Sequence, residues 1–316
     1  MATDIRKIGI VGTGTIGASW AAFYLSRGLD VAATDPADGA EGRLRAYVDT
    51  ALAEISEHGL LQPGSESAQL TFDSDLGSGL AGVDFVQENG PERIDIKHSL
   101  LQSIETAVGP DVIIASSSSG LKVSDMQEAM SAPERMILGH PFNPPHVVPL
   151  VEVAGGTKTS EDVVARTLSF YQAQGKVPVH LRKEMKGHIA NRIQAAVVRE
   201  VFYLVQEGVA SVEDIDKALS QGPGLRWAVL GQFVNSSLGG GPGGFKAMMS
   251  KFAPALEAWW ADLGTITTAS DELVTNISDQ LDAIFAEHSS DKIAAARDQV
   301  VFSTIKAKLA EPDLPY

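Results

Sequence analysis

A glycine-rich turn between an apolar run and a helical pattern constrains this chain more than any other feature. Residues 7–11 (KIGIV) are followed at once by Gly12, Gly14 and Gly17 in the spacing G-x-G-x-x-G, and residues 18–25 then show a helical pattern. Gly12 permits a tight turn, Gly14 lets the backbone approach a pyrophosphate, and Gly17 lets the helix pack close to the strand. The turn therefore predicts the first strand and helix of a dinucleotide-binding fold.

The residues around this turn predict which dinucleotide binds. The helix start at Thr15 and Ile16 offers free N–H groups and a positive dipole end to phosphates. A second strand pattern at residues 29–34 ends at Asp35, 18 residues after Gly17, close to the spacing of a ribose-binding acid. A carboxylate there accepts hydrogen bonds from both ribose hydroxyls and repels a 2′-phosphate, which favours NAD over NADP. The alternative is a helix-capping aspartate before Pro36.

Strand and helix patterns alternate through the first 182 residues. We expect strands at residues 83–87, 111–115, 135–138, 147–153 and 176–181, and helices at 39–61, 93–107, 121–130 and 160–174. Such alternation predicts a Rossmann-like, doubly wound and mostly parallel sheet with helices on both faces.

The pattern changes after residue 182. Helical stretches are expected at 183–207, from Ser211 onward, and at 245–260, 271–287 and 290–309, with no recurring strand. The chain is therefore predicted to be an α/β protein, with a nucleotide-binding domain at 1–182 and an all-helical domain at 183–316. The glycine-rich residues 236–244 are expected to form a loop, either a mobile lid or a plain connector.

The stretch 139–153 (GHPFNPPHVVPLVEV) contains a candidate general base. A carboxylate such as Glu152 beside an imidazole such as His140 fixes the tautomer and stabilises the cation that forms when the base takes a proton. The alternative is a loop with a satisfied histidine and a surface glutamate. His146 shares their spacing, but three prolines interrupt the strand and the spacing matches no common zinc pattern, so no metal is predicted.

Composition excludes several classes of function. The chain has 316 residues, a net charge of −15 and no cysteine. Its acidic field disfavours nucleic acids and anionic membranes, and no apolar run approaches the roughly 20 residues that span a bilayer. Because Arg6 and Lys7 lead straight into the first strand pattern, we expect no signal peptide. The absence of cysteine excludes disulfides and thiol catalysis, and it fits a cytoplasmic enzyme.

Several spaced motifs together resemble the 3-hydroxyacyl-CoA dehydrogenase family and its carnitine and gulonate relatives. They are GIVGTGTIG at 9–17, Glu92 with Lys97, SSSSGL at 116–121, GHPFNPPHVVPLVEV at 139–153 and GHIANRI at 187–193. The resemblance covers nearly the whole chain. It implies an NAD-dependent dehydrogenase of a small 3-hydroxy acid and a homodimer formed through the helical domain.

The resemblance also implies residue roles by motif position. His140 is the expected base and Glu152 its partner, while Ser119 and Asn191 hydrogen-bond the substrate oxygen. Besides the glycine turn with Thr15 and Ile16, the residues expected to hold NAD are Asp35, Glu92, Lys97, Ser117 and Asn143.

Departures from the family pattern bear on the substrate. CoA-using members typically have Asn-Thr where this chain has Ser117 and Ser118, and a Phe where it has His188. The segment 222–231 looks more like the carnitine and gulonate enzymes. L-carnitine is therefore the expected substrate, with L-gulonate and 3-hydroxybutyryl-CoA as alternatives, and a non-catalytic NAD-binding protein as an alternative of another class.

Four residues are expected to bind such a substrate. Arg226 could clamp a free carboxylate with its planar fork, and the aromatic faces of Phe142, Trp227 and Phe252 could surround a quaternary ammonium. The alternatives are a surface arginine and ordinary core packing of the aromatic rings.

Overall fold

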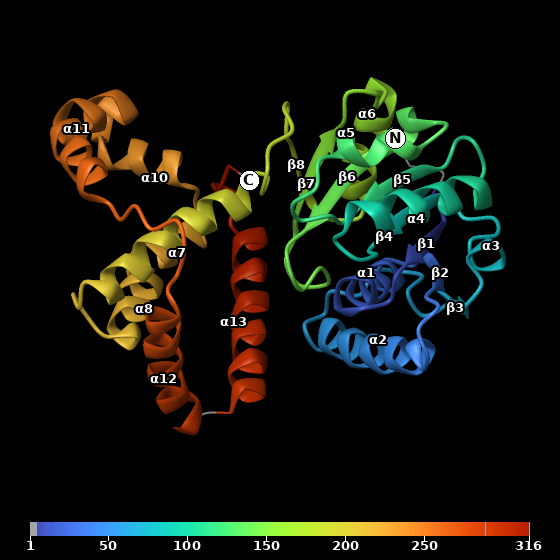
Figure 1. The fold of residues 1–316 in the computed structure, drawn as a ribbon, viewed down its shortest axis with the longest axis horizontal. Helices are drawn as coiled ribbons and strands as arrows, with labels where there is room; N and C mark the ends of the chain where they lie inside the picture. The colour runs from blue at the N-terminus through green and yellow to red at the C-terminus, as the bar shows by residue number, and fades with distance from the viewer. Residues whose placement is uncertain (1–4, 288, 316) are drawn as a thin grey trace. The chain divides into compact units, whose positions relative to one another are not determined.

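The fold is described here from a computed structural model, over residues 5–287 and 289–315. Contacts between residues divide the chain into two compact units, one up to Arg192 and the other from Ile193. The predicted boundary, after residue 182, lies ten residues earlier. Figure 1 shows that the first unit contains the sheet and that the second contains helices.

The first unit is built on an eight-stranded sheet in the order β3-β2-β1-β4-β5-β6-β7-β8. The strands are β1 (Lys7–Val11), β2 (Asp30–Thr34), β3 (Leu70–Asp73), β4 (Phe85–Glu88), β5 (Ile113–Ser116), β6 (Met136–Pro141), β7 (Leu150–Gly155) and β8 (Val177–His180). All neighbouring pairs are parallel except β6 with β7. The predicted doubly wound and mostly parallel sheet is confirmed.

Helices cover both faces of the sheet. The helices and 3-10 turns of this unit are α1 (Thr15–Ser26), α2 (Ala40–Glu57), α3 (Leu76–Gly79), α4 (Ile94–Ala107), α5 (Val123–Met126), η1 (Gln127–Ala129), η2 (Pro133–Arg135) and α6 (Glu161–Ala173). One buried cluster joins α1, α2 and α6 to alternate strand residues such as Ile8, Ile10 and Phe85. The other joins α3, α4 and α5 to the residues between them, such as Val11 and Val86. This alternation follows from the two-residue period of a strand.

Three details of the first unit differ from the sequence expectations. The strand β3 was not predicted, because its four residues carry no long apolar run. The helix expected at 121–130 is only the four-residue α5 followed by the 3-10 turn η1. His140 lies inside β6 rather than after the end of a strand, and β7 runs antiparallel to β6, so the two strands form a hairpin.

The second unit is helical, which confirms the predicted all-helical C-terminal region. Its elements are α7 (Ala190–Gln206), which begins at the end of the first unit, α8 (Val212–Gln221), α9 (Pro223–Trp227), α10 (Gln232–Gly239), η3 (Gly241–Gly243), α11 (Gly244–Asp262), α12 (Asp271–Glu287) and α13 (Ser290–Ala310). A small core joins α7, α8 and α12 through Val205, Val212, Ile215 and Leu273. The hydroxyl of Ser211 caps α8 by accepting a hydrogen bond from the Asp214 N–H.

Two expectations for this region were wrong. Residues 183–189 do not belong to the helix that follows, because Gly187 and His188 adopt positive φ angles of 73° and 52° and interrupt the helical pattern. The glycine-rich stretch 236–244 is not a continuous loop either, since α10 extends to Gly239 and η3 follows it. Glycine-rich composition hid these short helical turns.

Candidate active site

The glycine turn after β1 has the close approaches that its sequence predicts. Gly12 has a φ of 82°, and a Cβ atom placed on it would lie 2.9 Å from the Asn89 carbonyl oxygen. A Cβ on Gly17 would lie 1.9 Å from the Gly12 carbonyl oxygen. A Cβ on Gly14 would meet nothing within 4 Å, so this glycine faces open space. Gly12 and Gly17 therefore allow tight backbone packing, while Gly14 leaves the approach to the start of α1 clear.

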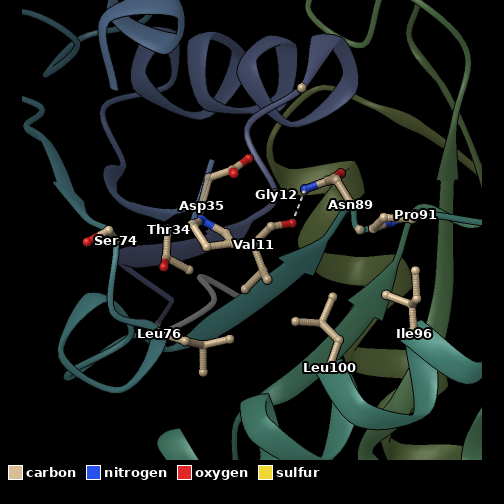
Figure 2. A pocket seen from close by; sticks show the side chains of 13 residues that line it. Val11, Gly12, Thr34, Asp35, Ser74, Leu76, Asn89, Pro91, Ile96 and Leu100 are labelled. Atoms are coloured by element: carbon tan, nitrogen blue, oxygen red, sulfur yellow. Dashed lines mark hydrogen bonds between the residues drawn. The ribbon is translucent and has the colours of Figure 1, made fainter. Parts of the chain in front are cut away.

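A cavity of ≈ 610 Å³ opens beside this turn. It is lined by Val11, Gly12, Gly14, Thr34, Asp35, Pro36, Ser74, Leu76, Asn89, Gly90, Pro91, Ile96 and Leu100. Figure 2 shows Asp35, which follows β2, and Asn89, which follows β4, on either side of Gly12, with Leu76 and Leu100 below them in the view. Apolar side chains beside polar groups suit a flat ring system joined to a ribose. The residues at this edge of the sheet therefore fit a dinucleotide.

The carboxylate of Asp35 stays ionised at the rim of this cavity. Its carboxylate accepts hydrogen bonds from the Thr13 N–H (2.7 Å), the Thr13 hydroxyl (3.0 Å) and the Ala37 N–H (2.9 Å). Partial burial raises the pKa of Asp35, but these hydrogen bonds and the nearby Arg43 lower it more, so the pKa is below its usual value. Asp35 thus contributes a fixed negative charge where the sequence predicts a ribose.

Thr15, Ile16 and Gly17 of the glycine turn do not line this cavity, and neither do the four residues outside the turn that were predicted to hold NAD besides Asp35. The Lys97 ammonium is buried and donates to both oxygens of Glu88, at 2.8 Å each, and to the Gly90 carbonyl. One oxygen of Glu92 accepts hydrogen bonds from the Ser118 hydroxyl (2.7 Å) and the Gly120 N–H (2.8 Å). In this structure Lys97 and Glu92 order the loops beside the cavity, and their direct contact with NAD stays a prediction.

Ser117 and Asn143 occupy different settings. The Ser117 hydroxyl donates to Asn89 Oδ1 (2.7 Å) and accepts from Gln87 Nε2 (2.8 Å) and from the Trp20 indole (3.2 Å). It therefore belongs to a polar network between strands. Asn143 is exposed in the turn that follows β6. The cofactor roles of both residues stay predictions.

Of the residues that line the cavity, only Gly12, Gly14 and Asp35 were predicted to bind the cofactor. Asn89, Gly90 and Pro91 follow β4 directly, at the same edge of the sheet as the glycine turn, and that position could have identified them. Ser74 and Leu76 follow β3, so they could not be found without recognising that strand.

His140 and Glu152 form a buried pair across the β6–β7 hairpin. They are directly opposed in the antiparallel register, and His140 Nδ1 lies 2.9 Å from Glu152 Oε2. The two residues are 4% and 1% exposed. Because a carboxylate only accepts hydrogen bonds, Nδ1 carries the proton and Nε2 keeps a free lone pair. The pair predicted from residues 139–153 is therefore present with the geometry of an oriented general base.

The second oxygen of Glu152 holds the start of α7. Glu152 Oε1 accepts hydrogen bonds from the Ile189 N–H (2.7 Å) and the Ala190 N–H (3.0 Å). Burial raises the pKa of Glu152, but the hydrogen bonds from His140 and from these two amides lower it more. Glu152 therefore stays ionised. Its hydrogen bonds hold the start of α7 beside the pair, and Asn191 is the second residue of that helix.

The turn that follows β5, residues 117–119, is connected to the His140–Glu152 pair through His188. His188 Nε2 lies 3.1 Å from the Ser118 carbonyl oxygen, and the His188 ring centroid lies 4.9 Å from that of His140. Ser119 is the next residue in the chain and is exposed. The structure thus brings the Ser119 turn, the start of Asn191's helix and the His140–Glu152 pair together, while the contacts of Ser119 and Asn191 with substrate stay predictions.

A buried lysine supports the turn between β6 and β7. The Lys176 ammonium donates to the carbonyl oxygens of Pro145 and Val148, and it lies 4.1 Å from the centre of the Phe23 ring. Burial lowers its pKa.

His146, also in this turn, shares hydrogen bonds with Ser19 on α1. Over residues 5–287 and 289–315, no three His, Asp or Glu side chains are placed to hold a metal ion.

The predicted substrate residues are divided between the two units. The Phe142 ring lies 6.2 Å from the His140 ring in the first unit. Trp227 on α9 donates its indole N–H to Gln232, and Arg226 beside it is exposed. Phe252 on α11 is 43% exposed, with the Lys251 ammonium 5.3 Å from its ring centre. Substrate binding by all four residues stays a prediction.

The sequence matches one protein family over most of its length. A sequence model described as "3-hydroxyacyl-CoA dehydrogenase, NAD binding domain" matches residues 7–185, and one described as "3-hydroxyacyl-CoA dehydrogenase, C-terminal domain" matches residues 187–263. The chain belongs to the 3-hydroxyacyl-CoA dehydrogenase family. As a member of that family it is an NAD-dependent dehydrogenase, an oxidoreductase that acts on a CH–OH group, and NAD is its cofactor.

Individual proteins resemble the chain over nearly its whole length. An L-carnitine dehydrogenase of Streptomyces coelicolor is 40% identical, covering 96% of this chain and 95% of its own. A 3-hydroxyacyl-CoA dehydrogenase of Gibberella moniliformis is 38% identical, covering 98% and 96%. The crystal structure of 5-formyl-3-hydroxy-2-methylpyridine 4-carboxylic acid 5-dehydrogenase, an NAD-dependent dismutase, is 30% identical, with a TM-score of 0.83 and coverage of 97% and 99%.

Proposed function

We propose that this enzyme oxidises the 3-hydroxyl of L-carnitine to give 3-dehydrocarnitine. The observation that carries the proposal is the 40% identity, over 96% of the chain, to an L-carnitine dehydrogenase. The buried His140–Glu152 pair, with its free Nε2, supports a step in which an alcohol loses a proton.

The chain's own residues account for the proton in this reaction. His140 Nε2 accepts the hydroxyl proton, and the resulting cation is stabilised by the Glu152 carboxylate at Nδ1. Ser119 and Asn191 donate hydrogen bonds to the oxygen as it becomes a carbonyl. When NAD is bound, its nicotinamide supplies the acceptor for the hydride that leaves the carbinol carbon.

Residues of the second unit support a substrate that carries both a carboxylate and a cationic group. Arg226 is a cation beside the aromatic Trp227, and Phe252 is a half-exposed ring. A guanidinium binds carboxylates in a bidentate manner, and an aromatic face attracts a quaternary ammonium by about 0.5–2 kcal/mol. L-gulonate has a carboxylate and no cation, and a CoA thioester has no free carboxylate, so neither uses both features.

One substrate comparison tests the proposal. We expect kcat/KM with NAD to be higher for L-carnitine than for D-carnitine, L-gulonate, 3-hydroxybutyrate or 3-hydroxybutyryl-CoA. Phe252→Ala should raise KM for L-carnitine without altering turnover of L-gulonate, and Phe285→Ala, on α12 and 44% exposed against 43% for Phe252, serves as a matched control. A lack of carnitine oxidation, or a higher efficiency with L-gulonate, would refute the proposed substrate.

His140→Gln tests the base separately from the substrate. We expect it to lower turnover of the best substrate by about 10²–10⁴-fold, because no other group takes the proton. NADH binding, followed by fluorescence, should survive because His140 does not line the dinucleotide cavity. Near-normal turnover would show that another group is the base.

We further propose that the enzyme works as a homodimer formed through its helical unit. None of the described residues of α9, α10 and α11 is buried within the chain itself. Side chains such as Phe233 and Trp259, which are 78% and 61% exposed, give this surface an apolar character.

A further inference from the structure

His188 is a buried imidazole to which the proposed reaction assigns no role. Its side chain is 5% exposed, and its ring lies 4.9 Å from the His140 ring at an interplanar angle of 51°. Among residues 5–287 and 289–315 it is the one non-glycine residue with a positive φ, 52°. A β-carbon disfavours this conformation, which persists only where surrounding contacts impose it, so the strain points to a role for the side chain.

The hydrogen bond of His188 defines its tautomer. Nε2 lies 3.1 Å from the Ser118 carbonyl oxygen, which only accepts, so Nε2 carries the proton. Burial lowers the pKa of His188, and although the Ser118 carbonyl opposes this shift, the neighbouring His140 adds to it. Near neutral pH His188 is thus an uncharged ring with one N–H, and that N–H donates to the Ser118 carbonyl.

His188 and the two residues that follow it contact three parts of the site. The ring packs against His140 on β6, and its N–H holds the carbonyl that precedes Ser119. The next two amides of the chain, those of Ile189 and Ala190, donate to Glu152.

We propose that His188 is a positioning residue that sets the orientation of the His140 ring and the place of the Ser119 hydroxyl. The proposal rests on the proposed role of His140 as the base and deepens it. His188 touches no reacting atom. Its neutral ring gives His140 a polar neighbour without adding a second positive charge when His140 takes the substrate proton.

The groups that face His188 come from several elements. A void of ≈ 10 Å³ adjoins its ring, which is room for about one water. The titratable and charged side chains that line this void or influence the ring are His140 on β6, Glu152 on β7, Glu92 before α4, Lys122 before α5 and Glu184 after β8.

Two substitutions separate the ring from its hydrogen bond. His188→Phe keeps an aromatic ring against His140 but cannot donate to the Ser118 carbonyl, whereas His188→Gln keeps an N–H donor. His98→Phe is the matched control, because His98 Nε2 makes the same kind of bond to the Asp125 carbonyl outside the site, at 2.8 Å. The measurements are kcat and KM with the best substrate across pH, and the melting temperature.

We expect His188→Phe to lower kcat by about 10- to 100-fold, because small errors in orientation are costly for proton transfer. The pH profile of kcat/KM should change as well, because an apolar ring replaces the polar neighbour of the proposed base. His188→Gln should recover most of kcat, and His98→Phe should retain all of it. An unchanged rate and pH profile in His188→Phe would overturn the proposal, as would equal losses in Phe and Gln that follow the melting temperature.

A measurement on the unmutated protein does not depend on folding of the variants. With isotope-labelled histidine, NMR near pH 7 should find His188 neutral with its proton on Nε2, and a proton on Nδ1 or a charged ring would overturn the proposal.

His140→Gln separates the proposed role of His188 from the proposed role of His140 as the base. If that variant keeps its turnover, the base role fails; if it is inactive and His188→Phe is unaffected, only the role of His188 fails.

Discussion

At the scale of single residues, two carboxylates stay ionised in partly or fully buried settings by the same means. Asp35 and Glu152 each lose water, which raises the pKa, and each gains hydrogen-bond donors that lower it further than burial raises it. Four of the donors are the backbone amides of Thr13, Ala37, Ile189 and Ala190. Because these amides come from the local chain path, both charges depend on how the backbone folds.

Asp35 is expected to determine the choice of cofactor. The carboxylate would repel the 2′-phosphate of NADP, so kcat/KM should be far higher with NAD than with NADP. Asp35→Ala should narrow the gap by removing the charge, and Asp35→Asn should narrow it while keeping an acceptor for the Thr13 amide. Equal use of both cofactors by the unmutated enzyme would contradict this prediction.

Glu152 is expected to make stability depend on pH. Its pKa in the folded protein lies below the ordinary value of 4.5. Its ionised form therefore adds stability that is fully present above that value and is lost as pH falls through the lowered pKa. The free energy of unfolding of Glu152→Gln, measured with urea, should lie below that of the unmutated enzyme at pH 7 and approach it in acid. Glu257→Gln, an exposed change on α11, is the control, and a difference independent of pH would show that the charge is not responsible.

At the scale of elements, the β6–β7 hairpin and the turn before α7 assemble the base. The antiparallel register opposes His140 to Glu152, and the positive φ angles of Gly187 and His188 direct the next two amides onto Glu152. The helix therefore begins at Ala190, seven residues later than its sequence pattern predicts. The late start lets Asn191 lie in the first turn of a helix whose N-terminal amides bind Glu152.

A pair of glycine substitutions tests this turn. Gly187→Ala should destabilise the protein by about 1–2 kcal/mol, because a β-carbon is unfavourable in the left-handed region, and it should also lower kcat by displacing the amides from Glu152. Gly42→Ala is the matched control: it lies in α2, where a Cβ meets nothing within 4 Å, and should stabilise by about 0.5–1 kcal/mol. Thermal unfolding and steady-state kinetics measure both effects. Full activity in Gly187→Ala would show that the placement of these amides on Glu152 does not affect turnover.

At the scale of the whole molecule, the two units differ in how much apolar surface they bury. The sheet unit contains two extensive buried clusters, whereas the helical unit has one small core around Val205 and Leu273. No helix in the described part of the chain is long and apolar enough to cross a membrane. The proposed homodimer would cover the exposed apolar side chains of α9–α11.

Sedimentation should find twice the mass of one chain in solution. Phe233→Asp places a charge on a side chain that is 78% exposed in the single chain and should shift the protein toward monomer. Leu61→Asp, in the sheet unit and 38% exposed, should leave the association unchanged. A monomeric unmutated enzyme would disprove the dimer.

The sheet fold, the glycine turn, the candidate base and the family could all be predicted from the sequence alone. These features depend on local chemistry: a β1 run followed by three spaced glycines, or a histidine and a glutamate in one short stretch, can be recognised without knowing any distant contact. Asp35 was identifiable for the same reason, because its spacing from Gly17 follows from one strand–helix–strand unit.

The partners of the other polar residues could be identified only from the folded chain. Lys97 pairs with Glu88, Ser117 joins a network with Trp20 and Gln87, and His188 meets both His140 and Ser118. Their partners come from other strands and helices, often far away in the chain, so no local pattern specifies them. The use of a buried polar group depends on which donors and acceptors surround it after packing, because each such group must find a partner once water is excluded.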